Sequence, residues 1–187
     1  MTNSPGYDGM WLPVAEDPRT QGNPQGELAT YREYLNNYRT TLRLKCDGLT
    51  PEQLATQSVP PSNMSLLGLV RHMARVEHNW FRRFLQGQWD QPRLYRTEDE
   101  PDLDFTGAVG TQDCVDDGFA SWDRVIAEAE RWCDALTEDQ LGDEIPFADR
   151  DETASIRDIL VHMIEEYARH AGHADLLREC IDGRTGQ

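Results

Sequence analysis

Three polar residues interrupt an apolar helical pattern near the end of the chain. Glu166, His170 and His173 lie in a segment that otherwise places apolar residues at three- and four-residue spacing. At about 100° per residue, His170 lies about 20° from Met163 around the helix axis, Glu166 about 60° and His173 about 80°. The polar side chains therefore lie on or beside the face that this helix buries. The apolar residues of the pattern are Ile156, Ile159, Leu160, Met163, Tyr167, Ala174, Leu177 and Ile181.

A metal ion would account for a carboxylate in such a position. Burying a carboxylate is costly unless another group compensates its charge. A Glu-x3-His spacing puts two metal ligands on one face of a helix, here Glu166 and His170. His72 lies beside the apolar face of an earlier helical segment and can face this pair if the two helices pack side by side. Two imidazoles and one carboxylate suit zinc, or a related ion such as nickel, with open coordination positions.

Other interpretations of the same residues stay open at this point. His72 taken alone is more often a hydrogen-bonded histidine of the core or its boundary, and Glu166 could instead pair with a neighbouring arginine. His173 is a candidate to orient a ligand or substrate, to relay a proton, or to replace Glu166 as a ligand. His162 is expected at the boundary of the core and is a second candidate for the relay. His78 lies about 240° from His72 around its helix, so it is left out of the site.

Amphipathic periodicity predicts the helices that position these residues. Ser65 and Ser155 are expected N-caps, while Gly48, Gly87 and Gly183 are expected to stop the preceding helices. No segment shows convincing strand alternation. The four predicted helices cover residues 27–47, 65–86, 114–136 and 155–181.

The segments outside these helices fall into two kinds. Residues 1–26 are rich in proline and glycine, which predicts an irregular N-terminal arm that Trp11 and Leu12 could hold against the body. The connection 87–113 is long for a small bundle, so we expect it to cross the fold or to cover a site. The prediction is thus an all-α four-helix bundle over 27–187, with a long connection between its second and third helices.

Composition excludes several classes of function. The net charge of −16 over 187 residues argues against binding to nucleic acids or to anionic membrane surfaces. The sequence has no apolar run of about 18 residues and its start lacks the apolar core of a signal peptide. The four cysteines form no C-x2-C pair, so a reduced cytoplasmic protein is expected. Cys133 and Cys180 fall at helical apolar positions and are predicted to be packing residues.

Four blocks of the sequence resemble the DinB-like superfamily of metal-binding four-helix bundles. This superfamily includes mycothiol-dependent maleylpyruvate isomerases and bacillithiol transferase-like proteins, and an uncharacterised bacterial branch of it is the most similar. The likeness extends over residues 27–186. The blocks that carry it, in this order and spacing, are 38–49, 65–73, 76–81 and 161–178.

This resemblance implies a ligand set and a type of chemistry. His72 matches the ligand that family members place on the second helix, and Glu166 and His170 match the pair on the last helix. His173 stands where many relatives have glutamine, which leaves its role open. The resemblance also implies a divalent ion, a low-molecular-weight thiol such as mycothiol, a small electrophilic substrate and a possible homodimer.

We therefore expect a metal-dependent transferase or isomerase that uses such a thiol on a small electrophile. The substrate would occupy an open coordination position under the connection 87–113. Two alternatives remain: a non-catalytic, stress-related protein that binds a metal or thiol, and a structural bundle whose site has lost its metal.

Overall fold

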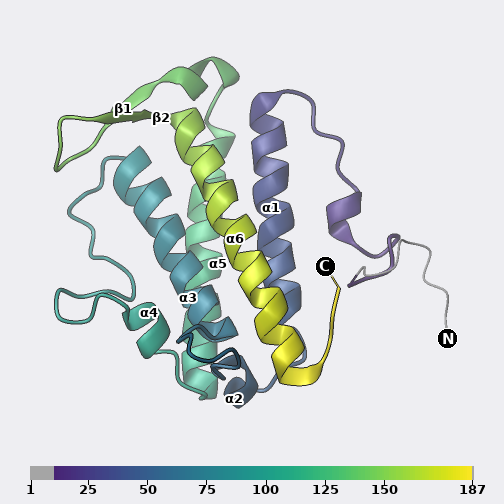
Figure 1. The fold of residues 1–187 in the computed structure, drawn as a ribbon. Coiled ribbons are helices and arrows are strands. Elements are labelled where there is room, and N and C mark those ends of the chain that lie inside the picture. The colour runs from purple at the N-terminus through teal and green to yellow at the C-terminus, as the bar shows by residue number, and fades with distance from the viewer. Residues whose placement is uncertain (1–10, 187) are drawn as a thin grey trace.

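The computed structural model of the protein describes residues 11–186, and long helices dominate this part of the chain (Figure 1). They pack around a single apolar core to which each of them contributes. The predicted all-α four-helix bundle is confirmed. Its main helices are α1 (Glu27–Cys46), α3 (Leu66–Glu77), α5 (Gln112–Asp134) and α6 (Ile156–Asp182).

The helices that carry the predicted ligands, α3 and α6, run antiparallel and side by side (Figure 1). The imidazole of His72 lies 4.6 Å from that of His170, and the Trp80 ring, further along the chain, lies 4.9 Å from that of His162. As the residue number rises on one helix it falls on the other. The prediction that His72 faces Glu166 and His170 required these two helices to pack side by side, and they do.

The second predicted helix is built from two kinds of helix. Ser65 caps it as expected, because its hydroxyl oxygen accepts the Gly68 N–H at 3.0 Å. The α-helix ends at Glu77 and continues as the π-helix η2 (His78–Leu85), before Gly87 with a φ of +65°. A π-helix takes more residues per turn than an α-helix, but eight residues are too few to show the difference as a periodicity in the sequence.

The long connection between η2 and α5 folds back against α3. It contains the short helix α4 (Leu103–Thr106), which packs on the first turns of α3. Gly68 permits this close approach, since a Cβ atom there would lie 2.8 Å from Cδ1 of Phe105. The other short helices of the described chain are η1 (Pro18–Thr20), α2 (Pro51–Leu54) and η3 (Glu138–Gly142).

Two short strands correct the expectation that the chain has none. β1 (Glu144–Pro146) and β2 (Thr153–Ser155) pair antiparallel, with Ile145 opposite Ala154, and cross one end of the bundle (Figure 1). Three residues are too few to show a period of two in a sequence. Ser155 then caps α6 as expected, through a reciprocal pair of hydrogen bonds with Asp158.

A polar network crosses the core beside the ligand-bearing helices. The Glu77 carboxylate is fully buried and accepts hydrogen bonds from Arg39, with Nε at 2.8 Å and Nη2 at 3.0 Å. The Tyr167 hydroxyl donates to Oε1 of Glu77 at 2.7 Å and accepts the Trp122 indole N–H at 2.9 Å. Burial first, and the Glu77 charge second, raise the pKa of Tyr167 well above its ordinary value. The network ties α1, α3, α5 and α6 together.

The N-terminal arm meets the end of α6, where Trp11 is 7 % exposed. The guanidinium of Arg184 lies 3.5 Å from the Trp11 ring centre and the ammonium of Lys45 lies 4.3 Å from it. Trp11 thus holds the described part of the arm, as expected. The prediction of an irregular arm over residues 1–10 lies outside the described residues, and the domain boundary stays a prediction.

One cysteine prediction was wrong. Cys133 is buried as expected, but Cys180 is exposed. Cys180 lies about 100° from Met163 around α6, which takes it off the buried face. No helix within residues 11–186 is long and apolar enough to cross a lipid bilayer.

Candidate metal centre

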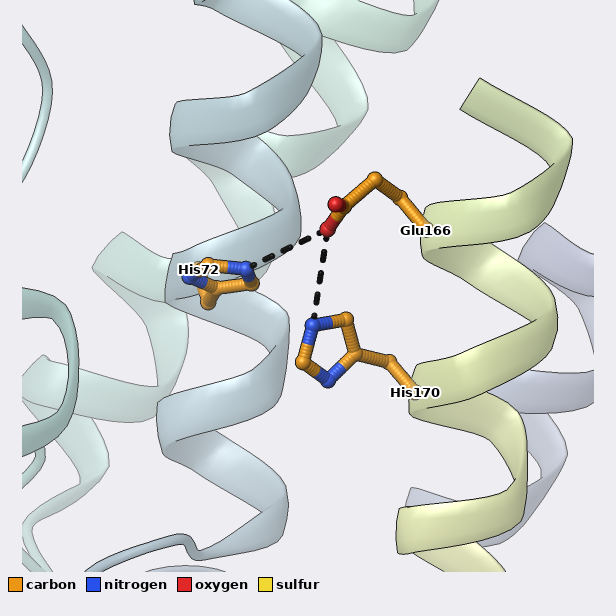
Figure 2. Close-up of side chains that lie close together, drawn as sticks. All are labelled: His72, Glu166 and His170. Carbon is orange, nitrogen blue, oxygen red and sulfur yellow. Dashed lines mark ion pairs between the residues drawn. The ribbon is translucent and has the colours of Figure 1, made fainter. Parts of the chain in front are cut away.

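The structure brings three of the predicted site residues together between α3 and α6 (Figure 2). Oε2 of Glu166 lies 3.6 Å from Nε2 of His170 and 3.9 Å from Nε2 of His72. One potential ligand atom from each of the three residues lies within 4.8 Å of the other two. His170 is buried, while His72 and Glu166 are partly exposed, so the group is accessible from the surface.

The donor set and its spacing fit a divalent ion. The separations of 3.6 and 3.9 Å are longer than a hydrogen bond between these groups. Ligand atoms bonded at 2.0–2.2 Å to a tetrahedral zinc ion lie about 3.4 Å apart, so little movement would be needed. Two imidazole nitrogens and one carboxylate oxygen are also a donor set that zinc uses when it keeps a position open.

A buried carboxylate behind His72 sets the orientation of its ring. Oδ2 of Asp104, on α4, lies 2.8 Å from Nδ1 of His72, and Asp104 is fully buried. An ionised carboxylate can only accept, so Nδ1 carries the proton and donates it. In the neutral ring the lone pair is then on Nε2, the atom that faces Glu166. Carboxylates hold metal-binding histidines in this way in many proteins.

Two neighbours hold Asp104 and His72 in place. Nε of Arg75 lies 3.3 Å from Oδ2 of Asp104, and the same side chain donates to the Pro101 carbonyl at 3.0 Å. The Phe105 ring stacks on that of His72, with centres 5.2 Å apart. Sequence reasoning missed Asp104. The only feature that distinguished Asp104 in the sequence was its position between the apolar residues Leu103 and Phe105. Nothing in the sequence indicated which acid of the long connection reaches α3.

His173 contacts His170 and is not one of the three converging residues. Its Nδ1 lies 3.3 Å from Nδ1 of His170, whose other nitrogen faces Glu166. Burial first, and then the charges of His170 and Arg169, lower the pKa of His173. This contact is the one expected of a residue that orients a ligand. The prediction that His173 relays a proton stays a prediction.

The three residues also shift one another's protonation. Interaction with the His170 imidazole, and then with that of His72, holds the pKa of Glu166 well below its usual range. Burial lowers the pKa of His72, but Asp104 and Glu166 together outweigh it, so the net pKa is raised. An ionised carboxylate between two imidazoles is what an incoming cation would meet.

The remaining histidines lie where the sequence placed them. His162 is half-buried at the boundary of the core, with Nε2 3.8 Å from Oε1 of Glu166. His78 lies outside the group and is buried, and its Nε2–H donates to the Pro92 carbonyl at 3.0 Å. Burial is the first cause that lowers the pKa of His78.

The sequence matches the mycothiol-S-transferase family over residues 30–183. The chain belongs to this family. The match includes every residue of the candidate metal centre and confirms the resemblance to the DinB-like superfamily. Membership of the mycothiol-S-transferase family relates the protein to thiol transfer and to small-molecule substrates.

Comparison with other proteins adds support for the fold alone. None of the curated proteins matches this member of the mycothiol-S-transferase family. Among solved structures, it is similar to a conserved protein from Enterococcus faecalis, with 18 % sequence identity and a TM-score of 0.63. The alignment covers 86 % of this chain and 99 % of the other.

Proposed function

We propose that the protein is a metal-dependent transferase or isomerase that joins a low-molecular-weight thiol, such as mycothiol, to a small electrophile. His72, Glu166 and His170 would hold the divalent ion, with zinc favoured and nickel the alternative. The observation that carries the proposal is the convergence of these three residues, with Asp104 bonded behind His72, in a chain of the mycothiol-S-transferase family.

A divalent ion bound at this position would lower the pKa of a thiol and favour its thiolate form. The protein's own residues have distinct tasks around it. Asp104 keeps the lone pair of His72 directed at the site, and His173 contacts the far nitrogen of His170. His162 is half-exposed beside Glu166, so it joins His173 as a candidate to accept the proton that the thiol releases.

The transfer can be written with all atoms balanced. The thiol sulfur forms a bond to an electrophilic carbon, the bond from that carbon to its leaving group breaks, and the thiol proton passes to a base. With 1-chloro-2,4-dinitrobenzene as the electrophile, the products are the thioether, chloride and a proton. This reaction is convenient because the thioether absorbs in the near ultraviolet, where the starting electrophile absorbs little.

The test compares turnover of mycothiol and this electrophile by metal-loaded and chelator-treated protein. We expect activity with zinc or nickel, loss on chelation, recovery on adding the ion, and loss in Glu166→Gln. Glu179→Gln is the matched control, because Glu179 is exposed on the same helix. Turnover that survives both chelation and Glu166→Gln would refute the proposal. Binding of ion and thiol without turnover, across a range of electrophiles, would instead support a non-catalytic carrier.

A further inference from the structure

A cavity lies beyond the candidate metal centre, at the end of the bundle that the β1–β2 hairpin crosses. It has a volume of about 170 Å³, and η2, the start of the long connection and the hairpin loop enclose it. Aromatic rings form much of its wall. Around the Phe84 ring, the rings of Trp80, Trp89 and Phe147 lie with their centres 5.4, 5.6 and 4.5 Å away. Such walls suit a flat or apolar molecule.

Guanidinium groups form the polar part of the same wall. Arg83, Arg93 and Arg150 line the cavity together with one acid, Asp149, so the lining carries three positive charges and one negative charge. Arg150 is partly neutralised, because its Nε lies 3.0 Å from the carboxylate of Glu152. A positive cavity stands out in a chain whose net charge is −16. It would attract an anion despite the negative charge of the chain as a whole.

Arg83 is the unusual member of this group. The residue is 8 % exposed, and its buried Nε has no hydrogen-bond partner within the described part of the chain. A buried, unpaired charged donor is costly, and native proteins retain few of them. Burial first, and the nearby charge of Arg93 second, lower the pKa of Arg83, while Asp90 opposes them. A bound anion would remove this cost.

We propose that this cavity binds a small aromatic or unsaturated carboxylic acid, with Arg83 as the buried anchor of its carboxylate. Guanidinium groups bind planar carboxylates through paired hydrogen bonds, and the aromatic walls accept the planar body. An apolar cavity of about 150 Å³ is large enough for benzene, so a molecule the size of benzoate fits here. Arg83, Trp80 and Phe84 all come from the π-helix η2, a type of helix often found at functional sites.

This cavity, which we call the acid pocket, adjoins the candidate metal centre through His162. The ring of His162 lies 4.9 Å from that of Trp80, and its Nε2 lies 3.8 Å from Oε1 of Glu166. Trp80 and His162 therefore lie between a molecule anchored at Arg83 and Glu166, one of the residues proposed to hold the ion. We infer that the electrophile of the proposed reaction is a carboxylic acid bound in this pocket, and this role rests on the proposed function. The binding of the acid to the pocket does not depend on the proposed function.

The test is calorimetric titration of chelator-treated protein with benzoate and with benzamide, its uncharged analogue. We expect benzoate to bind and to shift the indole NMR signals of Trp80 and Trp89, and benzamide to bind much more weakly. Arg83→Met should weaken benzoate binding by about 10- to 100-fold, as expected for the loss of a charged hydrogen bond. Arg82→Met is the matched control, since its side chain bonds Glu128 at 3.0 Å and lines a different hollow.

Several outcomes separate this inference from the proposed function. No binding of benzoate, equal binding of benzamide, or unchanged affinity in Arg83→Met would overturn the acid pocket even if the metal-dependent activity is confirmed. If Arg83→Met does not fold, Arg93→Met serves as the second variant, with a smaller loss of affinity expected because Arg93 is exposed. Benzoate binding that persists after chelation supports the pocket whether or not the protein turns over a thiol.

Discussion

Nδ1 of His72 donates a hydrogen bond to Oδ2 of Asp104 across 2.8 Å, which joins α3 to the short helix α4 of the long connection. Because the carboxylate only accepts, the bond fixes the ring nitrogen that is free to bind an ion. The connection between the second and third helices thus takes part in the site, and does not only cross the fold.

Asp104→Asn should weaken zinc binding without unfolding the protein. An amide lacks the negative charge that supports the imidazole, and loss of such a partner typically lowers metal affinity by about 10- to 100-fold. Competition with a chromogenic chelator measures the change. Asp102→Asn is the control, since Asp102 precedes the same short helix and is exposed. Equal zinc affinity in Asp104→Asn and the native protein would contradict this role.

Gly68→Ala should disturb the same contact from the opposite side. The added Cβ would lie 2.8 Å from Cδ1 and 3.5 Å from Cα of Phe105, so α4 must shift and carry Asp104 with it. We expect a loss of about 1–3 kcal/mol in the free energy of unfolding, together with weaker zinc binding. Gly172→Ala, where a Cβ meets nothing within 4 Å, should not destabilise the fold. Urea denaturation compares the two variants, and equal stability would contradict the prediction.

Glu77→Gln should be among the most destabilising conservative changes in the core. It removes the buried carboxylate that pairs with Arg39 and leaves only the longer contact, 3.5 Å, with the half-exposed Glu130. Breaking a buried pair in this way costs about 3–5 kcal/mol. Glu128→Gln is the matched control, because its pair with Arg82 is partly exposed and should contribute at most about 1 kcal/mol. Denaturant unfolding of chelator-treated protein gives both values. If Glu77→Gln loses no more free energy of unfolding than Glu128→Gln does, the prediction is contradicted.

His78 should make the fold less stable in mild acid. Because burial lowers its pKa below the ordinary value of 6.5, the unfolded chain binds a proton more readily than the folded one. The stability that the folded state has with His78 neutral is therefore fully present above pH 6.5 and is lost as the pH falls below that value. His78→Gln, which can still donate to the Pro92 carbonyl, should lose less stability between about pH 7.5 and pH 5.5. Melting temperatures of chelator-treated protein at the two pH values measure this, and equal losses would be evidence against it.

The sequence predicted those parts of the site that lie on regular helices. His170 and Glu166 share a helical face, so their proximity followed from periodicity alone. The pairing with His72 needed the tertiary packing that the family resemblance implied, and α3 and α6 do pack in that way. The metal ligation of these residues stays a prediction, as does a proton relay by His173.

The parts that the sequence did not predict depend on segments without a helical period. Asp104 reaches His72 only because the long connection returns to α3, and many acids of that connection looked equivalent. Arg83 gave no signal because an arginine on a predicted helix is usually exposed, and only the folded η2 shows its buried Nε. The β1–β2 hairpin is too short to carry a pattern, and Cys180 lies just beyond the edge of the apolar face on which it was predicted.

The most direct test of the central claim is calorimetric titration of zinc into chelator-treated native protein and into His170→Ala. The native protein should bind one zinc ion per chain, and its melting temperature should rise with the ion, since a ligand that binds only the folded state stabilises it. His170→Ala should lose tight binding and this rise. Equally tight zinc binding by both proteins, or none by the native protein, would contradict the assignment of His72, Glu166 and His170 as the ligands.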